Sequence, residues 1–265
     1  MLDSYGREIH YLRISVTDRC NLRCRYCMPE EGIPLLRHDQ ILSFEQIAAV
    51  ASAAAGLGMD KIRLTGGEPL ARKGLADLVR RLADIPGIRT LAMTTNGTML
   101  SPNAKTLADA GLDSVNVSLD TLDPDKYRSI TRWGDLADAL AGIDAAIEAG
   151  FQVKINTVVM EDTSDEALEA LREFARGKGI AMQTIAHYSL QEEKRDAAEF
   201  ERPPPCGACN RIRLMANGTL RSCLHSDIDF PIDFNDIEGS IRAAVLAKPM
   251  RGTVSSTSSV GQIGG

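Results

Sequence analysis

Three cysteines lie close together near the start of the chain, at Cys20, Cys24 and Cys27. They are half of the six cysteines in a chain of 265 residues. A structural zinc ion usually takes four ligands in two close pairs, and no fourth cysteine or histidine lies next to this group. Short cysteine spacings also hold iron–sulfur clusters through thiolates. Three thiolates on a four-iron cluster would leave one iron open to a ligand from outside the protein.

The other three cysteines form a second group near the end of the chain. Cys206, Cys209 and Cys223 have the spacing C-x2-C-x13-C, and His225 follows two residues after the last of them. A histidine at that distance can bind the same metal ion, which would give a zinc site with three cysteines and one histidine. The alternative is a second four-iron cluster that again has an open iron.

The segments between these two groups predict the scaffold. Short β-rich apolar runs alternate with helical patterns, and helix starts are indicated by the capping box of Ser43 and Gln46 and by Ser101-Pro102. Such alternation implies a parallel sheet. Strands are predicted at Tyr11–Val16, Lys61–Thr65, Thr90–Thr95, Ser114–Leu119, Gln152–Val159 and Ala181–Ala186.

Six strand–helix units are too few for a closed eight-stranded barrel. We therefore predict an α/β fold, a partial (βα)6 TIM-like barrel, and a site at the C-terminal ends of the strands. The barrel is followed by a small C-terminal region, which is an iron–sulfur region if its cysteines hold the second cluster. The predicted division is a barrel at 1–188, a charged and proline-rich linker at 189–205, an auxiliary region at 206–250 and a Ser/Gly-rich tail at 251–265.

Composition narrows the classes of partner. The net charge of −6 disfavours a nucleic-acid or anionic-membrane surface, so a polyanionic ligand would need a local group of cations. The sequence has neither an apolar run of membrane-spanning length nor a signal-peptide core, and we expect a cytoplasmic protein. Disulfides are rare in the cytoplasm, so the clustered cysteines indicate metal or redox ligands first.

The spacing C-x3-C-x2-C with the aromatic Tyr26 before its last cysteine resembles the radical S-adenosylmethionine (SAM) enzymes. In that superfamily the open iron binds SAM, and one electron cleaves it to methionine and a 5′-deoxyadenosyl radical that takes hydrogen from a substrate. The strand-end segments TGGEP, TTNG and NVSLD follow in the superfamily's order. The resemblance implies cofactor contacts from Tyr26, Gly66, Gly67, Glu68, Thr94, Ser118 and Tyr188.

Longer segments are similar to one family, the GTP 3′,8-cyclases of molybdenum cofactor biosynthesis. They include RISVTDRCNLRCRYCMP, KIRLTGGEPLARK, NVSLDTLDPDKY, VKINTVVM, CNRIRL and the closing IGG. The resemblance implies two [4Fe-4S] clusters, held by Cys20, Cys24, Cys27, Cys206, Cys209 and Cys223, with the guanine of GTP on the second. It also implies GTP binding by Arg13, Lys61, Arg63, Lys154, Arg211 and Arg213.

The same resemblance implies a lyase that needs no side chain for its hydrogen abstraction, because the cofactors carry that step. The terminal Gly264 and Gly265 would reach the active site, and a reduced flavodoxin or ferredoxin-type donor would supply electrons; a homodimer is compatible with it. The chain departs from the family pattern at Gln183, where the family has an arginine, and in its short segment 188–205.

Two other functions stay open at this point. One is a paralogous radical SAM enzyme that acts on another nucleotide or on a peptide. The other is a non-catalytic regulator with two zinc sites. Iron content separates the regulator from both enzymes, because two four-iron clusters would hold roughly eight irons per chain.

Overall fold

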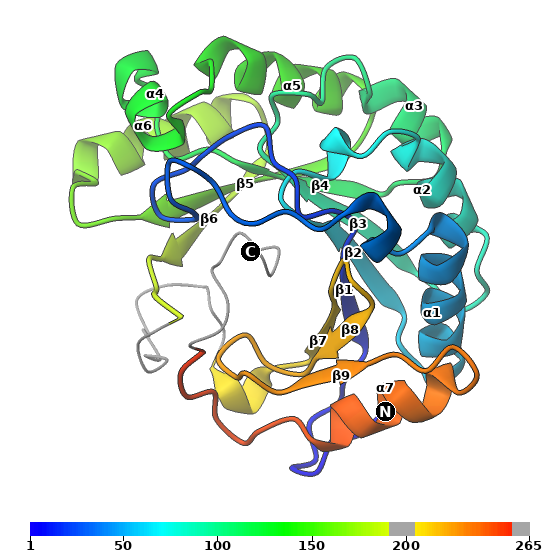
Figure 1. Ribbon diagram of the computed structural model, residues 1–265. Coiled ribbons are helices and arrows are strands. Elements are labelled where there is room, and N and C mark those ends of the chain that lie inside the picture. Colours follow the sequence, from blue (N-terminus) through cyan, green and yellow to red (C-terminus); the bar gives the residue numbers. More distant parts are fainter. Residues whose placement is uncertain (191–204, 256–265) are drawn as a thin grey trace.

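The computed structural model describes residues 1–190 and 205–255 (Figure 1). Within these residues nine strands form one sheet in the order β6-β5-β4-β3-β2-β1-β7-β8-β9. Strands β1 to β7 pair in parallel with one another, whereas the pairs β7–β8 and β8–β9 are antiparallel. The strands are β1 Tyr11–Ser15, β2 Lys61–Thr65, β3 Thr90–Thr95, β4 Ser114–Ser118, β5 Gln152–Val159, β6 Ala181–Ala186, β7 Arg211–Leu214, β8 Thr219–Arg221 and β9 Asp229–Pro231.

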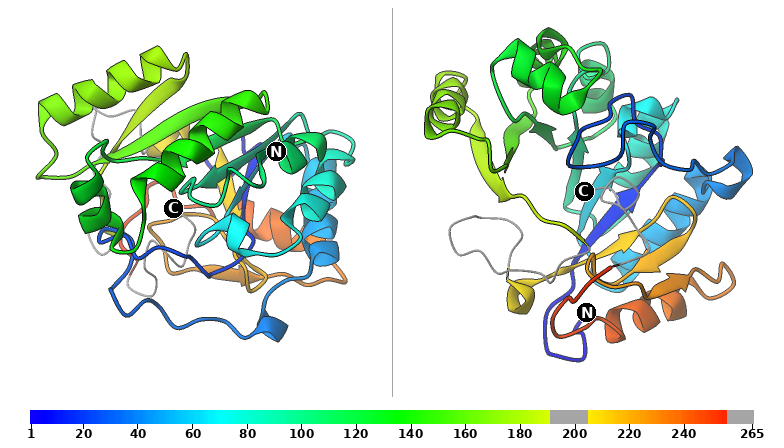
Figure 2. Two further views of the ribbon diagram at one scale, coloured as in Figure 1. Left: turned by 90° about the horizontal axis from the view of Figure 1, so that it is seen from above. Right: turned by 60° about the vertical axis from the view of Figure 1, so that its left-hand side comes forward.

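The predicted strand–helix alternation and parallel sheet are confirmed. All six predicted strands are present, and only the predicted ends at Val16 and Leu119 fall one residue outside. The helices lie along the outer face of the curved sheet in both further views (Figure 2). They are α1 Phe44–Gly56, α2 Leu75–Ala83, α3 Ala104–Asp109, α4 Pro124–Thr131, α5 Leu136–Glu148, α6 Asp165–Gly177 and α7 Ile237–Leu246, with short 3-10 turns at His38–Gln40, Pro69–Ala71 and Cys206–Ala208.

Two helix starts were predicted, and one of them was wrong. Ser43 and Gln46 form the expected capping box at the start of α1. Helix α3 begins at Ala104 with Asn103 as its N-cap, so Ser101-Pro102 does not start it. The carbonyl oxygen of Leu100 accepts hydrogen bonds from the amides of both Asn103 and Ala104, which folds this segment into a turn before the helix.

The C-terminal cysteine region continues the barrel sheet. Strand β7 pairs in parallel with β1, which places Arg211 opposite Tyr11 and Arg213 opposite Arg13. Local sequence could not predict this pairing, because the two strands are separated by almost 200 residues of chain. The proposed linker lies mostly outside the described residues, so the division of the chain into these regions stays a prediction.

The two faces of the sheet have different roles. On β1, Leu12 and Ile14 are fully buried and pack into the core beneath the helices, with Ile47 of α1. Tyr11 and Arg13 alternate with them and therefore point to the opposite face, into the barrel. Side chains on β1 thus alternate between the apolar core under the helices and the inner face of the barrel, which carries the polar ones. Within the described part of the chain, no helix is long and apolar enough to cross a membrane.

Candidate functional site

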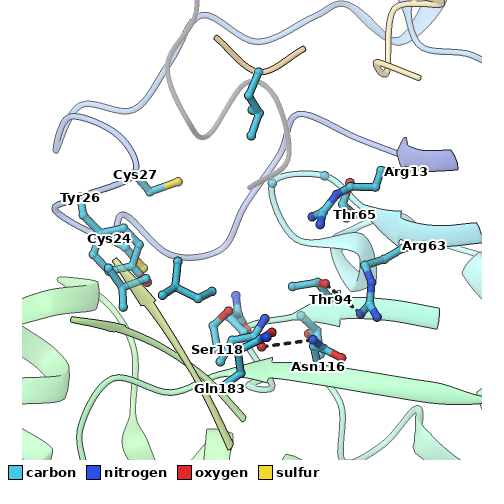
Figure 3. A pocket seen from close by; sticks show the side chains of 18 of the residues that line it. Arg13, Cys24, Tyr26, Cys27, Arg63, Thr65, Thr94, Asn116, Ser118 and Gln183 are labelled. Atoms are coloured by element: carbon cyan, nitrogen blue, oxygen red, sulfur yellow. Dashed lines mark hydrogen bonds between the residues drawn. The ribbon is translucent and has the colours of Figure 1, made fainter. Parts of the chain in front are cut away.

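A cavity of about 280 Å³ opens on the inner face of the sheet. Figure 3 shows Cys24, Tyr26 and Cys27 at one end of it and Arg13 and Arg63 at the other. The structure thus brings together most of the site residues expected from the sequence. Those lining the cavity are Cys20, Cys24, Cys27, Tyr26, Gly66, Gly67, Thr94, Ser118, Tyr188, Arg13, Lys61, Arg63, Arg211 and Arg213.

The first cysteine group offers three thiols to this cavity. None of Cys20, Cys24 and Cys27 forms a disulfide, and each is partly buried. Burial raises the pKa of all three thiols, that of Cys27 to about 12. Thiolates at these positions therefore need a positively charged partner such as iron. Three unbridged thiols around an open cavity fit a cluster that leaves one iron accessible.

Tyr26 ties the cysteine loop to the sheet. Its hydroxyl donates to the carboxylate of Asp120 at 2.9 Å, and that carboxylate also accepts from the amide of Val158 at 2.8 Å. Asp120 is buried, and burial raises its pKa to about 6. The aspartate of the NVSLD segment thus anchors the residue that precedes Cys27.

The glycine pair of TGGEP packs against the cysteine loop. A Cβ atom on Gly66 would lie 2.5 Å from the carbonyl oxygen of Thr17, and one on Gly67 would collide with the backbone of Arg19. The amide of Gly67 donates to the Thr17 carbonyl at 2.9 Å. Besides the cofactor contact that the resemblance implies, these glycines thus allow close approach to the chain leading into Cys20.

Glu68 supports the site from behind the cavity wall. Glu68 is 1% exposed, and its side chain does not line the cavity. One carboxylate oxygen accepts from the hydroxyl of Thr95 and the other from the amide of Asn96, both at 2.8 Å. The side chain of Asn96 in turn donates to Asn21, next to Cys20, at 2.9 Å. Glu68 therefore joins the end of β3 to the cysteine loop, while its predicted contact with the cofactor stays a prediction.

Five cations and a tyrosine form two rows across three neighbouring strands. Register places Lys61, Tyr11 and Arg211 side by side on β2, β1 and β7. Arg63, Arg13 and Arg213 form the next row in the same order. Alternation along each strand puts both rows on the inner face, and all six residues line the cavity. We call these six residues the cation rows.

Charge in the cation rows is concentrated enough to change the ionisation of its members. Burial opposes ionisation of Tyr11, but the guanidinium groups around it outweigh burial and lower its pKa to about 8. Arg63 Nε donates to the Tyr11 hydroxyl at 2.7 Å. Burial and repulsion by the neighbouring arginines lower the pKa of Arg213 to about 9. An anion in this part of the cavity would relieve that repulsion.

We expect Tyr11 to ionise near pH 8 in the ligand-free protein, below the ordinary tyrosine pKa of 10.0. A bound triphosphate would neutralise the surrounding guanidinium groups, so it should raise this pKa. The measurement is the ultraviolet absorbance of tyrosinate in metal-free protein, taken as parent minus Tyr11→Phe, with and without inorganic triphosphate. A midpoint at the ordinary tyrosine pKa without any anion would contradict the assigned charge.

Two further residues expected at the site differ in their placement. Gln183 on β6 lines the cavity and is 8% exposed. Lys154 lies on the same face of β5 as Asn156 but two residues nearer the start of the strand, and it does not line the cavity. Asn116 and Asn156 do line it, and Asn116 Nδ2 donates a hydrogen bond to Asn156 Oδ1 at 3.1 Å. Both lie within segments noted in the sequence, but neither had been assigned a role.

The second cysteine group lines a smaller neighbouring cavity. Its walls include Cys206, Cys209, Cys223 and His225. The two cavities share Tyr188, Leu224, Arg211 and Arg213 as lining residues, so these side chains lie between the cysteine groups. The ring of Tyr188 lies against that of His225, with centroids 5.8 Å apart. In the described residues no three His, Cys, Asp or Glu side chains converge on a position for one metal ion.

Two residues of the smaller cavity were missed in the sequence. Lys248 is 3% exposed, and its ammonium donates to the carbonyl oxygens of Arg211 and Ser222. It also lies beside Cys209. Burial raises the pKa of that thiol, but Lys248 and Arg211 together outweigh burial and lower it. A Cβ on Gly252 would lie 2.9 Å from Cys223 Sγ. Neither residue is near a cysteine in sequence, so spacing gave no signal for them.

The chain is similar to a superfamily model and to proteins of known name. The Radical SAM superfamily model matches residues 14–175. The protein named GTP 3′,8-cyclase from Pelotomaculum thermopropionicum is 41% identical over 307 residues, which covers 95% of this chain and 94% of the relative. Another of that name, from Thermodesulfovibrio yellowstonii, is 40% identical over 304 residues, covering 97% of this chain and 93% of the relative. Both alignments are longer than the chain, so each relative has residues that this chain lacks.

Solved structures support the fold. Streptococcus suis SuiB bound to S-adenosylmethionine matches with a TM-score of 0.67 at 17% identity, covering 89% of this chain and 68% of SuiB. Methylornithine synthase (PylB) matches with a TM-score of 0.58 at 15% identity, covering 97% of this chain and 76% of PylB. The superfamily model covers more than half of the chain, and the curated relatives align with nearly all of it. The chain therefore belongs to the GTP 3′,8-cyclase family of the radical SAM superfamily.

Proposed function

We propose that this chain is a radical SAM lyase that converts GTP to (8S)-3′,8-cyclo-7,8-dihydroguanosine 5′-triphosphate in molybdenum cofactor biosynthesis. The observation that carries the proposal is the position of the cation rows in the same cavity as the first cysteine group. An acidic protein can hold a nucleoside triphosphate only where cations are concentrated, and the cation rows supply such a place. The name of the relatives supports the same substrate.

The radical SAM family implies one [4Fe-4S] cluster and SAM, and Cys20, Cys24 and Cys27 are the residues that fit the cluster. When bound, the two groups together supply a radical that removes a hydrogen atom from the substrate. In the proposed reaction that hydrogen leaves ribose C3′, and a C3′–C8 bond forms. One electron and one proton then complete N7, so the product is an isomer of GTP.

The role of the protein is to hold GTP in position for this reaction. The arginines of the cation rows would bind the triphosphate, because a guanidinium group can donate two parallel hydrogen bonds to phosphate oxygens. The rows are anchored in three paired strands, so their spacing is fixed before the substrate arrives. Arg211 and Arg213 also line the second cavity, which would bring the guanine within reach of the second cysteine group.

The proposal includes a second [4Fe-4S] cluster held by Cys206, Cys209 and Cys223. Lys248 supports it, because a buried ammonium beside Cys209 favours the thiolate that iron needs. Gly252 supports it as well, since only glycine leaves room next to Cys223 Sγ. The terminal residues Gly264 and Gly265, expected at the active site, lie outside the described residues.

His225→Ala tests whether the second cluster has an open iron. We expect its iron content and spectrum to stay unchanged, because three thiolates suffice and the His225 ring packs against Tyr188. His225→Phe is the matched control, because it keeps an aromatic ring at this buried position. Loss of the second cluster from both variants would assign His225 as a ligand and remove the docking site for guanine.

The remaining parts of the proposal concern partners. The reaction takes up two electrons, one to cleave SAM and one to complete the product, so a reduced flavodoxin or ferredoxin-type donor is included. A homodimer, a cytoplasmic location and the four-part division of the chain stay predictions.

The experiment that tests the proposed function is incubation of reduced, iron-reconstituted protein with SAM and GTP. Products are separated by chromatography and identified by mass. We expect a new compound with the mass of GTP that elutes separately from it, together with 5′-deoxyadenosine. Formation of 5′-deoxyadenosine without any change to GTP, while another nucleotide is converted, would assign a different substrate.

A further inference from the structure

The residue after helix α4 has an unusual backbone conformation. Arg132 has φ 65° and ψ −42°, and in residues 1–190 and 205–255 it is the one residue other than glycine with positive φ. Side chains with a Cβ atom rarely adopt this conformation, and it persists only where surrounding contacts hold it. Arg132 had no role in the sequence analysis, and it does not line either cavity.

The end of α4 is docked onto the first cysteine loop. The last carbonyl groups of a helix have no partner within the helix. Here the carbonyl oxygen of Ile130 accepts from the amide of Arg25 at 2.9 Å, and that of Thr131 accepts from the amide of Arg23 at 3.0 Å. The loop and the helix end therefore satisfy each other's backbone groups on both sides of Cys24.

The Arg132 side chain adds a second connection to the same loop. Its Nη1 donates to the carbonyl oxygen of Arg23 at 2.6 Å and to that of Met28 at 3.0 Å. Residues 23 and 28 bracket Cys24 and Cys27, so one guanidinium group connects the two ends of the segment that carries both thiols. The unusual turn at Arg132 brings this side chain back toward the loop.

This connection matters because the loop has little regular structure of its own. Between β1 and the 3-10 turn at His38–Gln40 there is no helix or strand. If the segment had to become ordered when the cluster binds, the loss of conformational entropy would oppose binding. A loop already held in its binding conformation avoids that cost.

We propose that Arg132 is the positioning residue of the first cysteine loop, holding Cys24 and Cys27 at the separation that the cluster requires. Arg132 acts through the backbone of the loop and does not contact the cluster. The proposal goes beyond the proposed function, because it depends on the cluster that the radical SAM family implies and not on the identity of the substrate.

Three variants of the full chain separate the side chain from the turn. Arg132→Gly accepts positive φ without strain but removes the guanidinium group. Arg132→Lys keeps the charge but offers a single ammonium in place of the planar guanidinium. Arg128→Ala is the matched control, because Arg128 is an exposed arginine one turn earlier on the same helix.

The readout is the rate at which a ferrous chelator removes first-cluster iron, defined as the iron that the parent holds and Cys24→Ala lacks. We expect Arg132→Gly to lose this iron about ten-fold faster or more, as for other residues that orient metal ligands. Arg132→Lys should lie between it and the parent, and Arg128→Ala should match the parent. Cleavage of SAM in the absence of GTP should fall in the same order.

The proposal is overturned if Arg132→Gly keeps parent iron-release rates, because the residue would then only shape the turn. It is also overturned if Arg132→Gly and Arg132→Lys lose the iron of both cysteine groups equally, since that indicates general unfolding. Every readout is taken without GTP. A wrong substrate assignment would therefore leave these results unchanged.

Discussion

Replacement of Cys24 with alanine is expected to abolish reductive cleavage of SAM while iron remains at the second cysteine group. Cys24 lines the main cavity and lies between Cys20 and Cys27, so two thiols would remain at the first group. Two ligands cannot hold a four-iron cluster with only one open iron. The measurement is 5′-deoxyadenosine formed from SAM under a strong reductant, together with iron per chain.

Cys209→Ala is the matched control for this result. Its thiol lines the second cavity and not the first, so the variant should still form 5′-deoxyadenosine in the absence of GTP. Formation of 5′-deoxyadenosine by Cys24→Ala at the parent rate would show that the first group does not hold the SAM-cleaving cluster.

Arg213→Ala is expected to weaken GTP binding by at least about ten-fold, because a buried charge-assisted hydrogen bond contributes about 1.5–3 kcal/mol. Arg213 is 6% exposed and lies in the row with Arg13 and Arg63. SAM cleavage without GTP should hardly change, because Arg213 belongs to the cation rows and not to the first cysteine group. Equilibrium binding of GTP measures the effect. The control is Arg80→Ala, an exposed arginine of α2 that does not line the cavity.

Gln183→Arg should act in the opposite direction. Gln183 lines the same cavity from β6, where the family pattern has an arginine. An added guanidinium at this position would give the triphosphate another contact, so GTP should bind more tightly. Absence of GTP binding in the parent and in Gln183→Arg together would remove GTP as the substrate and leave only the radical SAM assignment.

The first six strands could be predicted because each carries its own local signal. Side chains two residues apart on a strand share a face of the sheet, which places Lys61 and Arg63 together on β2. Register between strands has no local signal. The cation rows exist because β7 pairs with β1, and only the folded chain shows that Arg211 and Arg213 extend them.

The structure adds contacts that family resemblance does not show. The cofactor contact of Glu68 stays a prediction, and the structure adds that its carboxylate accepts hydrogen bonds from the end of β3. Gly66 and Gly67 line the cavity but also pack against residues 17–19. A motif can thus persist because it supports the cysteine loop, and its sequence alone does not separate that role from ligand binding.

Arg132 and Lys248 had no signal in the sequence. Arg132 donates to the carbonyl oxygens of residues 23 and 28, about 100 positions earlier in the chain. It does so from a backbone conformation with positive φ, which is typical of glycine. Lys248 reaches Arg211 and Ser222 from the segment after α7. Both depend on contacts between distant parts of the chain, which spacing arguments cannot supply.

The central claim is that the first cysteine group and the cation rows serve one reaction, hydrogen removal from ribose C3′ of GTP. The most direct measurement uses GTP that carries deuterium at C3′, followed by mass analysis of the 5′-deoxyadenosine formed. The account predicts that this 5′-deoxyadenosine contains deuterium and that its labelling rises with turnover of GTP. Unlabelled 5′-deoxyadenosine, formed while GTP is consumed, would contradict the account.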